Sequence, residues 1–281
     1  YSLFVELRLI LKMIFWIASY PKSGNTWLRL LISNYLGSND LNLFNNLKYI
    51  QRFPDKKFFK GIVHEDDLKK DDMKIFKHFI TAQEKINLND ELNILKTHNF
   101  AGSIFGYPFT NSENSCGAIY IIRDPRSVVV SHAYHHGYDF EKSTNRILDK
   151  TVVAANDGYL EARLSWNVHY LSWKNINIPK IILRYEDLID DPYNNFLKIL
   201  EFINQFKKID IDENKINDVI KKCAFKQVSD NEKKFGFVEK KGKENFFRKG
   251  LVDEWKVVLK KDLIQKIEKE FYKEMRELKY I

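Results

Sequence analysis

The chain has 281 residues, of which 44% are hydrophobic and 30% are charged, and this composition is typical of a globular protein rather than a disordered or fibrous one. Its length suffices for one large domain or two small ones. The formal net charge of +8 favours an anionic partner, such as a nucleotide, a nucleic acid or an acidic surface, and charge alone does not choose among these.

The first residues of the chain are apolar, but their pattern is not that of a membrane span. Glu6, Arg8 and Lys12 interrupt the apolar side chains of residues 3–18, so no run approaches the ~20 residues that a span requires. No small-residue cleavage site precedes the next motif, which argues against a signal peptide. We therefore expect no membrane span, and we expect residues 1–12 to be an extension of one domain over residues 13–281.

Short apolar segments rich in isoleucine predict buried parallel strands. These segments are residues 13–20, 94–98, 118–123 and 180–185. Amphipathic or capped patterns predict helices at residues 26–36, from Pro125 onward, and at residues 192–203 and 262–278. Strands that alternate with helices imply an α/β fold, a single domain in which helices flank a central, mainly parallel sheet.

Residues of types that commonly bind ligands or take part in catalysis lie at or directly after the ends of these predicted strands. They are Lys22, His98, Arg123 and Tyr185. Open α/β sheets bind ligands in the crevice at the carboxyl ends of their strands. We therefore expect these four side chains to belong to one site.

The segment at residues 20–27, with the sequence YPKSGNTW, connects the first strand to the first helix. A turn with Gly24 followed by a helix N-terminus presents unpaired backbone N–H groups to an anion. Lys22 adds a positive charge, and Ser23, Asn25 and Thr26 add hydrogen-bonding side chains. The spacing differs from that of the GxxxxGK[ST] loop. The alternative to an anion-binding loop is a surface turn that contains Lys, Ser and Gly by chance.

Arg123 ends the third predicted strand, and Ser131 lies about two turns into the helix that follows. A guanidinium fork and a hydroxyl in this arrangement can hold a second phosphate group. The alternative is that Arg123 forms a structural ion pair and that Ser131 is an ordinary helix residue.

A basic stretch at residues 233–249 contains seven Lys or Arg residues against two Glu, and it leads into Arg248, Lys249 and Gly250. Such runs are usually solvated. Here the neighbouring aromatic residues indicate an ordered loop, in which Gly250 lets the backbone approach a phosphate.

Metal and disulfide chemistry find little support in the sequence. His132 and His136 share a helical face, but a zinc-protease HExxH motif needs Glu at position 133, where Ala133 stands. Cys116 and Cys223 form no CxxC pair. We therefore expect no metal site. We also expect both cysteines to be reduced, which is consistent with a cytoplasmic protein.

Taken together, these segments resemble the PAPS-dependent sulfotransferase family, of the cytosolic type. The family pattern YPKSGTTW looks like residues 20–27, its Arg and Ser match Arg123 and Ser131, and its RKGxxGDWK is similar to residues 248–256. Its KTH and YED segments resemble residues 96–98 and 185–187, so the resemblance spans about residues 15–256.

The chain departs from the family pattern at several positions. Asn25 replaces a Thr, Asn99 and Phe100 replace Leu-Pro, and Asp253 and Glu254 replace Gly-Asp. In the family's adenine segment, Thr/Ser-x-Phe, only Phe225 is retained. The dimerisation motif of the animal members is not apparent, so the resemblance implies no oligomeric state.

The resemblance implies transfer of a sulfuryl group from 3′-phosphoadenosine 5′-phosphosulfate (PAPS) to an acceptor hydroxyl or amine, without a metal. It implies that Lys22 contacts the bridging oxygen of the donor, that His98 is the base and that Lys96 supports the sulfuryl oxygens. A P-loop-like loop would hold the 5′-phosphate through Ser23, Gly24, Asn25 and Thr26. The remaining implied contacts are Arg123, Ser131, Arg248, Lys249 and Gly250 for the 3′-phosphate, and Trp27, Tyr185 and Phe225 for the adenine.

Two other functions stay open at this point. A P-loop-type kinase would share the strand–loop–helix cradle, and a nucleic-acid-binding protein would explain the charge, although no recognition motif is present. If His98 is not the base, a carboxylate of Glu65, Asp66 or Asp67 is the alternative.

The acceptor is expected to be a small molecule or a glycan. An apolar or ring-bearing acceptor is suggested by aromatic residues in the variable segments, although nearby lysines equally favour an acidic one. These residues are Phe44, Phe58, Phe59, Phe105, Tyr107, Tyr134, Tyr138, Phe235 and Phe237.

Overall fold

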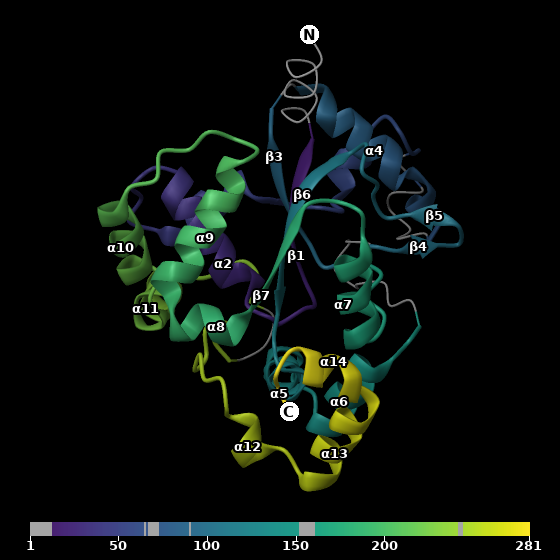
Figure 1. Cartoon of the computed structure of the whole chain (residues 1–281), viewed down its shortest axis with the longest axis vertical. Coiled ribbons are helices and arrows are strands. Elements are labelled where there is room, and N and C mark those ends of the chain that lie inside the picture. The colour runs from purple at the N-terminus through teal and green to yellow at the C-terminus, as the bar shows by residue number, and fades with distance from the viewer. Residues whose placement is uncertain (1–12, 65, 67–72, 90, 152–160, 241–243) are drawn as a thin grey trace.

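The computed structural model describes residues 13–64, 66, 73–89, 91–151, 161–240 and 244–281 (Figure 1). At its centre lies a five-stranded sheet with the strand order β2-β3-β1-β6-β7, in which every neighbouring pair is parallel. The strands are β1 (Ile14–Ser19), β2 (Gln51–Arg52), β3 (Asn93–Thr97), β6 (Ser115–Ile122) and β7 (Lys180–Arg184). A short antiparallel hairpin of β4 (Ser103–Ile104) and β5 (Tyr107–Pro108) lies outside it. The predicted α/β fold is confirmed.

Helices cover both faces of the sheet (Figure 1). On one side lie α2 (Asn25–Leu36), α8 (Tyr185–Asp190), α9 (Pro192–Asn204), α10 (Glu213–Lys222) and α11 (Phe225–Phe235). The other helices are α4 (Phe79–Ile86), α5 (Pro125–His136), α6 (Phe140–Leu148), α7 (Trp166–Asn175), α12 (Trp255–Val258), α13 (Lys261–Glu270) and α14 (Tyr272–Glu277). Short 3-10 helices span Leu43–Tyr49, Lys56–Phe59, Met73–His78 and Asn87–Asn89.

Strand β1 divides the hydrophobic core into two halves, because successive side chains of a strand point to opposite faces. Trp16 is fully buried in the half that contains α5, α7 and α13, whereas Phe15 and Ile17 are buried in the half that contains α2 and α9. Burial on both faces explains why the strand appears in the sequence as a continuous apolar run. Burial on both faces holds β1 in the centre of the sheet, and the first motif, residues 20–27, follows directly after its last residue, Ser19.

The four predicted strands and the four predicted helices are present, one of the helices with an interruption, whereas several further elements, among them β2, α4, α7 and α10, were not predicted. The two-residue strand β2 was not predicted, because a segment this short has no periodicity to detect. The helix expected over residues 262–278 is interrupted at Phe271, whose φ of −106° and ψ of 20° are not helical. Phe271 and Met275 are nevertheless fully buried, so the apolar stripe predicted which side chains face the core but not the break.

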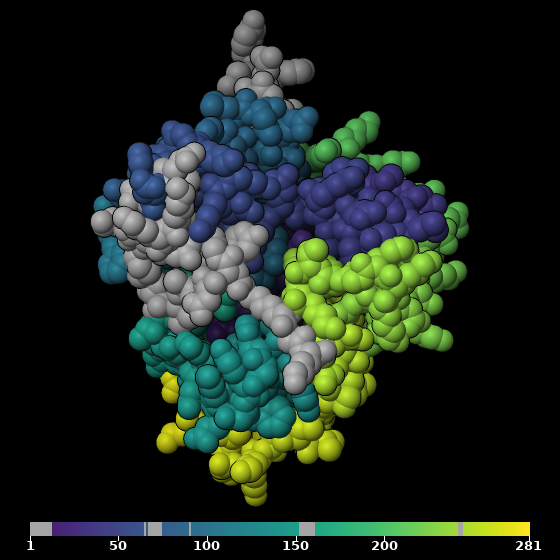
Figure 2. All heavy atoms as spheres, turned by 180° about the vertical axis from the view of Figure 1, so that it is seen from behind, coloured from purple at the N-terminus to yellow at the C-terminus, as the bar shows by residue number. Residues whose placement is uncertain are grey.

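The segment after α10 packs beside the segment after α2, as Figure 2 shows for the yellow-green and purple parts of the chain. The Leu43 N–H donates to Oδ1 of Asn231 at 3.2 Å, and the rings of Phe44 and Phe237 lie 4.5 Å apart between centroids. This packing brings the basic C-terminal stretch next to α2, the helix into which the first motif leads.

Among the described residues, no helix combines the length and the apolar character that crossing a membrane would require.

Candidate active site

A cavity of about 540 Å³ collects the predicted site residues at the carboxyl ends of the strands. This volume lies in the range of small-molecule sites, roughly 300–1,000 Å³. Every residue predicted to contact the donor or the acceptor proton lines this cavity, with the exception of Ser23. These residues are Lys22, Gly24, Asn25, Thr26, Trp27, Lys96, His98, Arg123, Ser131, Tyr185, Phe225, Arg248, Lys249 and Gly250.

The loop between β1 and α2 has the backbone of an anion cradle. Gly24 is the residue that precedes α2, with a φ of 95°, and it offers no side chain to cap the first N–H groups of the helix. A Cβ atom at Gly24 would lie 2.4 Å from Cδ2 of Tyr185, so the ring can close on the loop only because this residue is glycine. The backbone N–H groups at the start of α2 are therefore positioned for a ligand anion.

Two side chains of this loop are directed differently from the sequence prediction. The amide nitrogen of Asn25 donates to the carbonyl of Ile17 at 3.2 Å, which ties the loop to β1. Ser23 does not line the cavity, and its buried hydroxyl has no hydrogen-bond partner among the residues that the structure describes. At these two positions the backbone, rather than the side chain, is the group that can meet an anion.

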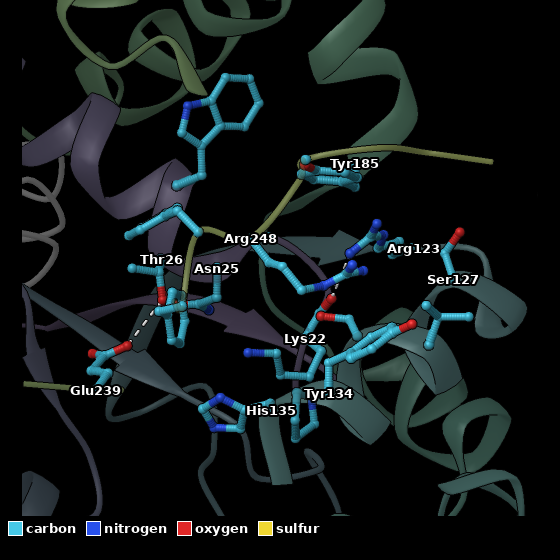
Figure 3. A pocket seen from close by; sticks show the side chains of 18 of the residues that line it. Lys22, Asn25, Thr26, Arg123, Ser127, Tyr134, His135, Tyr185, Glu239 and Arg248 are labelled. Atoms are coloured by element: carbon cyan, nitrogen blue, oxygen red, sulfur yellow. Dashed lines mark hydrogen bonds between the residues drawn. The ribbon is translucent and has the colours of Figure 1, made fainter. Parts of the chain in front are cut away.

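Arg123 connects the first motif to the C-terminal loop (Figure 3). Its Nη1 donates to the carbonyl of Lys22 at 3.3 Å, and its Nη2 donates to the carbonyl of Leu251 at 3.0 Å. The guanidinium carbon lies 4.6 Å from the centroid of the Tyr185 ring. Ser131 on α5 lines the same cavity, and no hydrogen bond joins its hydroxyl to a described residue.

The C-terminal loop supplies two further cations. Arg248 stacks 3.8 Å above the centroid of the Tyr134 ring, and both Arg248 and Lys249 form ion pairs with Glu254. Gly250 has a φ of 67°, and a Cβ there would lie 2.5 Å from the Phe225 ring. Glu254, one of the departures from the family pattern, thus serves as the counter-ion of this loop.

Three aromatic rings line the same cavity as these cations. Trp27 and Tyr185 meet edge to face with their centroids 6.1 Å apart, and the indole nitrogen of Trp27 donates to the carbonyl of Cys223 at 2.8 Å. Phe225 packs against Gly250 on the same side. Rings held in this way can enclose a flat heterocyclic base.

His98 is held in its neutral form. Its Nδ1 lies 2.9 Å from the carbonyl oxygen of Ser19, which can only accept a hydrogen bond, so the proton of the neutral ring is on Nδ1 and the lone pair is on Nε2. Burial, aided by the charge of Lys96, lowers the pKa of His98 well below its usual value. The imidazole is therefore able to accept a proton at neutral pH.

Lys96 is almost completely buried on β3, with a side chain that is 5% exposed. Burial lowers the pKa of Lys96 to about 8, although the carboxylate of Glu239, 3.7 Å from its Nζ, acts in the opposite direction. At neutral pH Lys96 is therefore mostly in its ammonium form, and it loses its proton as pH rises through about 8.

Sequence reasoning missed two carboxylates that line the cavity, of which Glu161 is buried and Glu239 is half-buried. Glu161 is fully buried and pairs with both Arg52 and Arg163; these charges outweigh burial and hold the pKa of Glu161 well below its usual range. Glu239 accepts hydrogen bonds from Thr26 at 3.0 Å and from Arg29 at 2.8 Å. The two contacts of Glu239 and the pair of Glu161 with Arg52 join distant segments, so no local pattern in the sequence could have indicated them.

The histidine cluster on α5 contains no metal-binding arrangement among the described residues. His132 and His136 have ring centroids 4.5 Å apart, and Nδ1 of His132 lies 3.2 Å from the Ser143 hydroxyl. Burial, followed by the neighbouring His136, lowers the pKa of His132 to about 3.

Most of the aromatic residues expected near the acceptor do not line this cavity. Of the nine aromatic residues expected there, Tyr134 is the one that lines the cavity within the described part of the chain. Phe59 is buried in the core, Phe44 and Phe237 pack against Phe246 and Phe247 without lining the cavity themselves, and Phe105 is 73% exposed.

The carboxylates suggested as alternative bases do not gain support. Asp66 is exposed and does not line the cavity, while Glu65 and Asp67 lie outside the described residues.

Comparison with known proteins agrees with this geometry. The family model described as "Sulfotransferase domain" matches residues 13–279. Among curated proteins, Sulfotransferase 1E1 of Rattus norvegicus is 22% identical, with the match covering 93% of this chain and 83% of that protein. Cytosolic sulfotransferase 3 of Arabidopsis thaliana is 26% identical over 90% of this chain and 73% of its own length.

Solved structures share the fold. A crystal structure of mouse sulfotransferase SULT7A1 complexed with PAP has a TM-score of 0.60 at 22% identity, covering 94% of this chain and 85% of the other. Retinol dehydratase in complex with androsterone and inactive cofactor PAP has a TM-score of 0.60 at 17% identity, covering 95% and 81%.

Proposed function

Because the chain belongs to the sulfotransferase domain family, we propose that it transfers a sulfuryl group from PAPS to an acceptor hydroxyl or amine. The prediction of a sulfotransferase is confirmed by the family match. The observation that carries the choice of donor is the presence of two cationic regions and of three aromatic rings in one cavity. A nucleotide with phosphate groups at both the 5′ and the 3′ positions of its ribose presents two anionic groups and one flat base to such a cavity.

The donor would be held from both ends. The backbone of residues 23–26 and Thr26 would bind the 5′-phosphate, and Trp27, Tyr185 and Phe225 would enclose the adenine. Arg123, Ser131 and residues 248–250 would bind the 3′-phosphate, which PAPS has and ATP lacks. PAP, which is adenosine 3′,5′-bisphosphate, accompanies two of the similar structures and is the product that such a donor leaves.

The chemistry requires one proton acceptor and stabilisation of one leaving group. The acceptor oxygen or nitrogen attacks sulfur, its proton passes to Nε2 of His98, and the bond between sulfur and the bridging oxygen breaks. The electron pair of that bond remains on the 5′-phosphate, where the ammonium group of Lys22 stabilises it. Lys96 would stabilise the sulfuryl oxygens, so lysines and arginines provide the neutralisation that a metal provides in kinases.

The rate constant kcat/KM should fall as pH rises through about 8, because Lys96 then loses its positive charge. Below this pH the ammonium group can stabilise the sulfuryl oxygens, and above it the neutral amine cannot. His98 makes no opposing contribution, since its depressed pKa keeps it neutral on both sides of pH 8. The measurement is kcat/KM for the donor across neutral and alkaline pH.

Lys96→Arg is the control for this pH profile, because a guanidinium stays protonated throughout the range. The variant should lack the decline near pH 8, whatever its absolute rate. A decline that persists unchanged in Lys96→Arg would mean that another group titrates.

A small-molecule acceptor is typical of this family, and polar side chains line the cavity beyond the proposed donor contacts. They are Arg52, Glu161, Arg163, His135 and His136. This lining favours an acceptor with several polar groups, such as a glycan unit, over a purely apolar phenol. A screen of alcohols, phenols, amines and sugars with labelled PAPS tests the proposed function, and transfer to none of these classes would oppose it.

The cytoplasm is the proposed location. Cys116 and Cys223 are both buried and free. Thiols kept in this state suit a reducing compartment.

A further inference from the structure

The side chain of Glu239 contacts residues of the donor cradle, although Glu239 has no role among the proposed donor contacts. Its Oε2 accepts a hydrogen bond from the Thr26 hydroxyl at 3.0 Å, as the dashed line in Figure 3 shows. Its Oε1 lies 2.8 Å from Nη1 of Arg29 and 3.7 Å from Nζ of Lys96. The cavity is lined by Glu239 itself, and its side chain is 28% exposed.

The carboxylate is ionised in this position. Burial by itself would raise the pKa of Glu239, but the charges of Lys96 and Arg29 and the hydrogen bonds from Arg29 and Thr26 outweigh burial and hold the pKa well below its usual range. A negative charge therefore sits among groups that are suited to bind a phosphosulfate. Two of these groups, Thr26 and Lys96, are the proposed contacts of the 5′-phosphate and of the sulfuryl oxygens.

In the loop that carries Glu239, Phe237 is packed into a cluster of aromatic rings and the next residue, Val238, is exposed. Phe237 is anchored in an aromatic cluster, with ring centroids 4.9 Å from Phe246 and 4.5 Å from Phe44. Val238, between this anchor and Glu239, is 97% exposed at the edge of the cavity. A rotation about these residues can withdraw the carboxylate without disturbing the hydrophobic core.

We propose that Glu239 is an internal anion that occupies the 5′-phosphosulfate position of the empty enzyme and is displaced by the donor. This inference rests on the proposed donor site. Two anions cannot share Thr26 and Lys96, because like charges at this separation repel strongly where solvent is largely excluded. Donor binding then requires the carboxylate to leave, so Glu239 lowers the affinity for every ligand that carries a 5′-phosphate.

The size of the effect depends on how often the cradle is vacant. The apparent affinity of a ligand falls in proportion to the fraction of molecules that are competent to bind it. If the carboxylate occupies the cradle about nine-tenths of the time, its removal raises affinity roughly tenfold.

Glu239→Gln tests this directly, because it removes the charge and keeps the shape of the side chain. Calorimetry should show PAP binding roughly tenfold more tightly to the variant than to the parent protein. Adenosine 3′-monophosphate, which has no 5′-phosphate, should bind both proteins equally, since it does not compete with Glu239.

Glu244→Gln is the matched control. Glu244 also lines the cavity, but it is exposed and makes no hydrogen bond or ion pair with a described residue. This variant should leave the affinity for PAP unchanged. An equal gain in Glu244→Gln, or an equal gain for adenosine 3′-monophosphate, would mean that general charge in the cavity is responsible and would overturn the proposal.

Arg29 is almost buried, so the loss of its partner in Glu239→Gln can weaken folding. Glu239→Asp is the second variant: it keeps the charge near Arg29 and is one methylene too short to reach Thr26 in the same way. It should give a smaller gain in PAP affinity. If neither variant binds PAP more tightly, Glu239 is only a structural counter-ion, whereas a parent protein that binds no nucleotide contradicts the proposed donor itself.

Discussion

Replacing His98 with alanine should lower turnover by about 10²-fold or more for an alcohol acceptor, with donor affinity nearly unchanged. The donor contacts proposed above do not include His98, whereas Nε2 of His98 is the atom that receives the acceptor proton. The loss should therefore appear in kcat and not in the dissociation constant of PAP. Steady-state kinetics together with calorimetry on the same preparation measures both quantities.

Two comparisons separate the chemical role of His98 from a structural one. His98→Asn can still donate a hydrogen bond to the carbonyl of Ser19 but cannot take a proton, so it should be as slow as His98→Ala. A phenol acceptor, which is already more acidic, should suffer less than an alcohol. Recovery of near parental turnover in His98→Asn would show that the histidine only supports the loop.

Replacing Lys22 with alanine should lower kcat by roughly 10²–10³-fold, the range found when one group that stabilises developing charge is removed. Lys22 lies in the cradle, where its Nζ is 4.0 Å from the centroid of the Phe246 ring. Its charge matters most when the bond to the bridging oxygen breaks, so PAP binding should weaken far less than catalysis slows. Lys22→Arg should restore part of the rate.

Lys234→Ala is the control for this loss of charge. Lys234 also lies over an aromatic ring, that of Phe235 at 5.0 Å, but it does not line the cavity. The variant should have parental kinetics. If Lys22→Ala and Lys234→Ala slow the reaction to the same extent, the net charge of the protein is responsible, not the position of Lys22.

The sequence was informative wherever a local pattern reports a local structure. Strand β1 appears as an apolar run because it is buried on both faces, and α5 begins where predicted because the Asp124 side chain accepts a hydrogen bond from the Arg126 N–H. Residues at strand ends, such as Lys22 and His98, could be grouped into one site because parallel strands share an edge.

Contacts between distant segments could not be predicted. Glu239 and Thr26 are 213 residues apart in the chain, and nothing near either residue encodes their hydrogen bond. The direction of the Asn25 side chain depends on the Ile17 carbonyl, which a motif does not specify. Composition also does not reveal which aromatic rings of the variable segments, such as Phe59, are buried in the core and so cannot line a pocket.

The choice of PAPS as donor depends most on the recognition of its 3′-phosphate by Arg123 and the C-terminal loop. The direct measurement is calorimetric titration of the parent protein with PAP, AMP and ATP–Mg²⁺, repeated with Arg123→Ala. PAP should bind on the order of 10²-fold more tightly than AMP, since charge-assisted hydrogen bonds are the stronger ones, and Arg123→Ala should remove most of that preference. Equal affinity for PAP and AMP, or tighter binding of ATP–Mg²⁺ than of PAP, would contradict the assignment of the donor site.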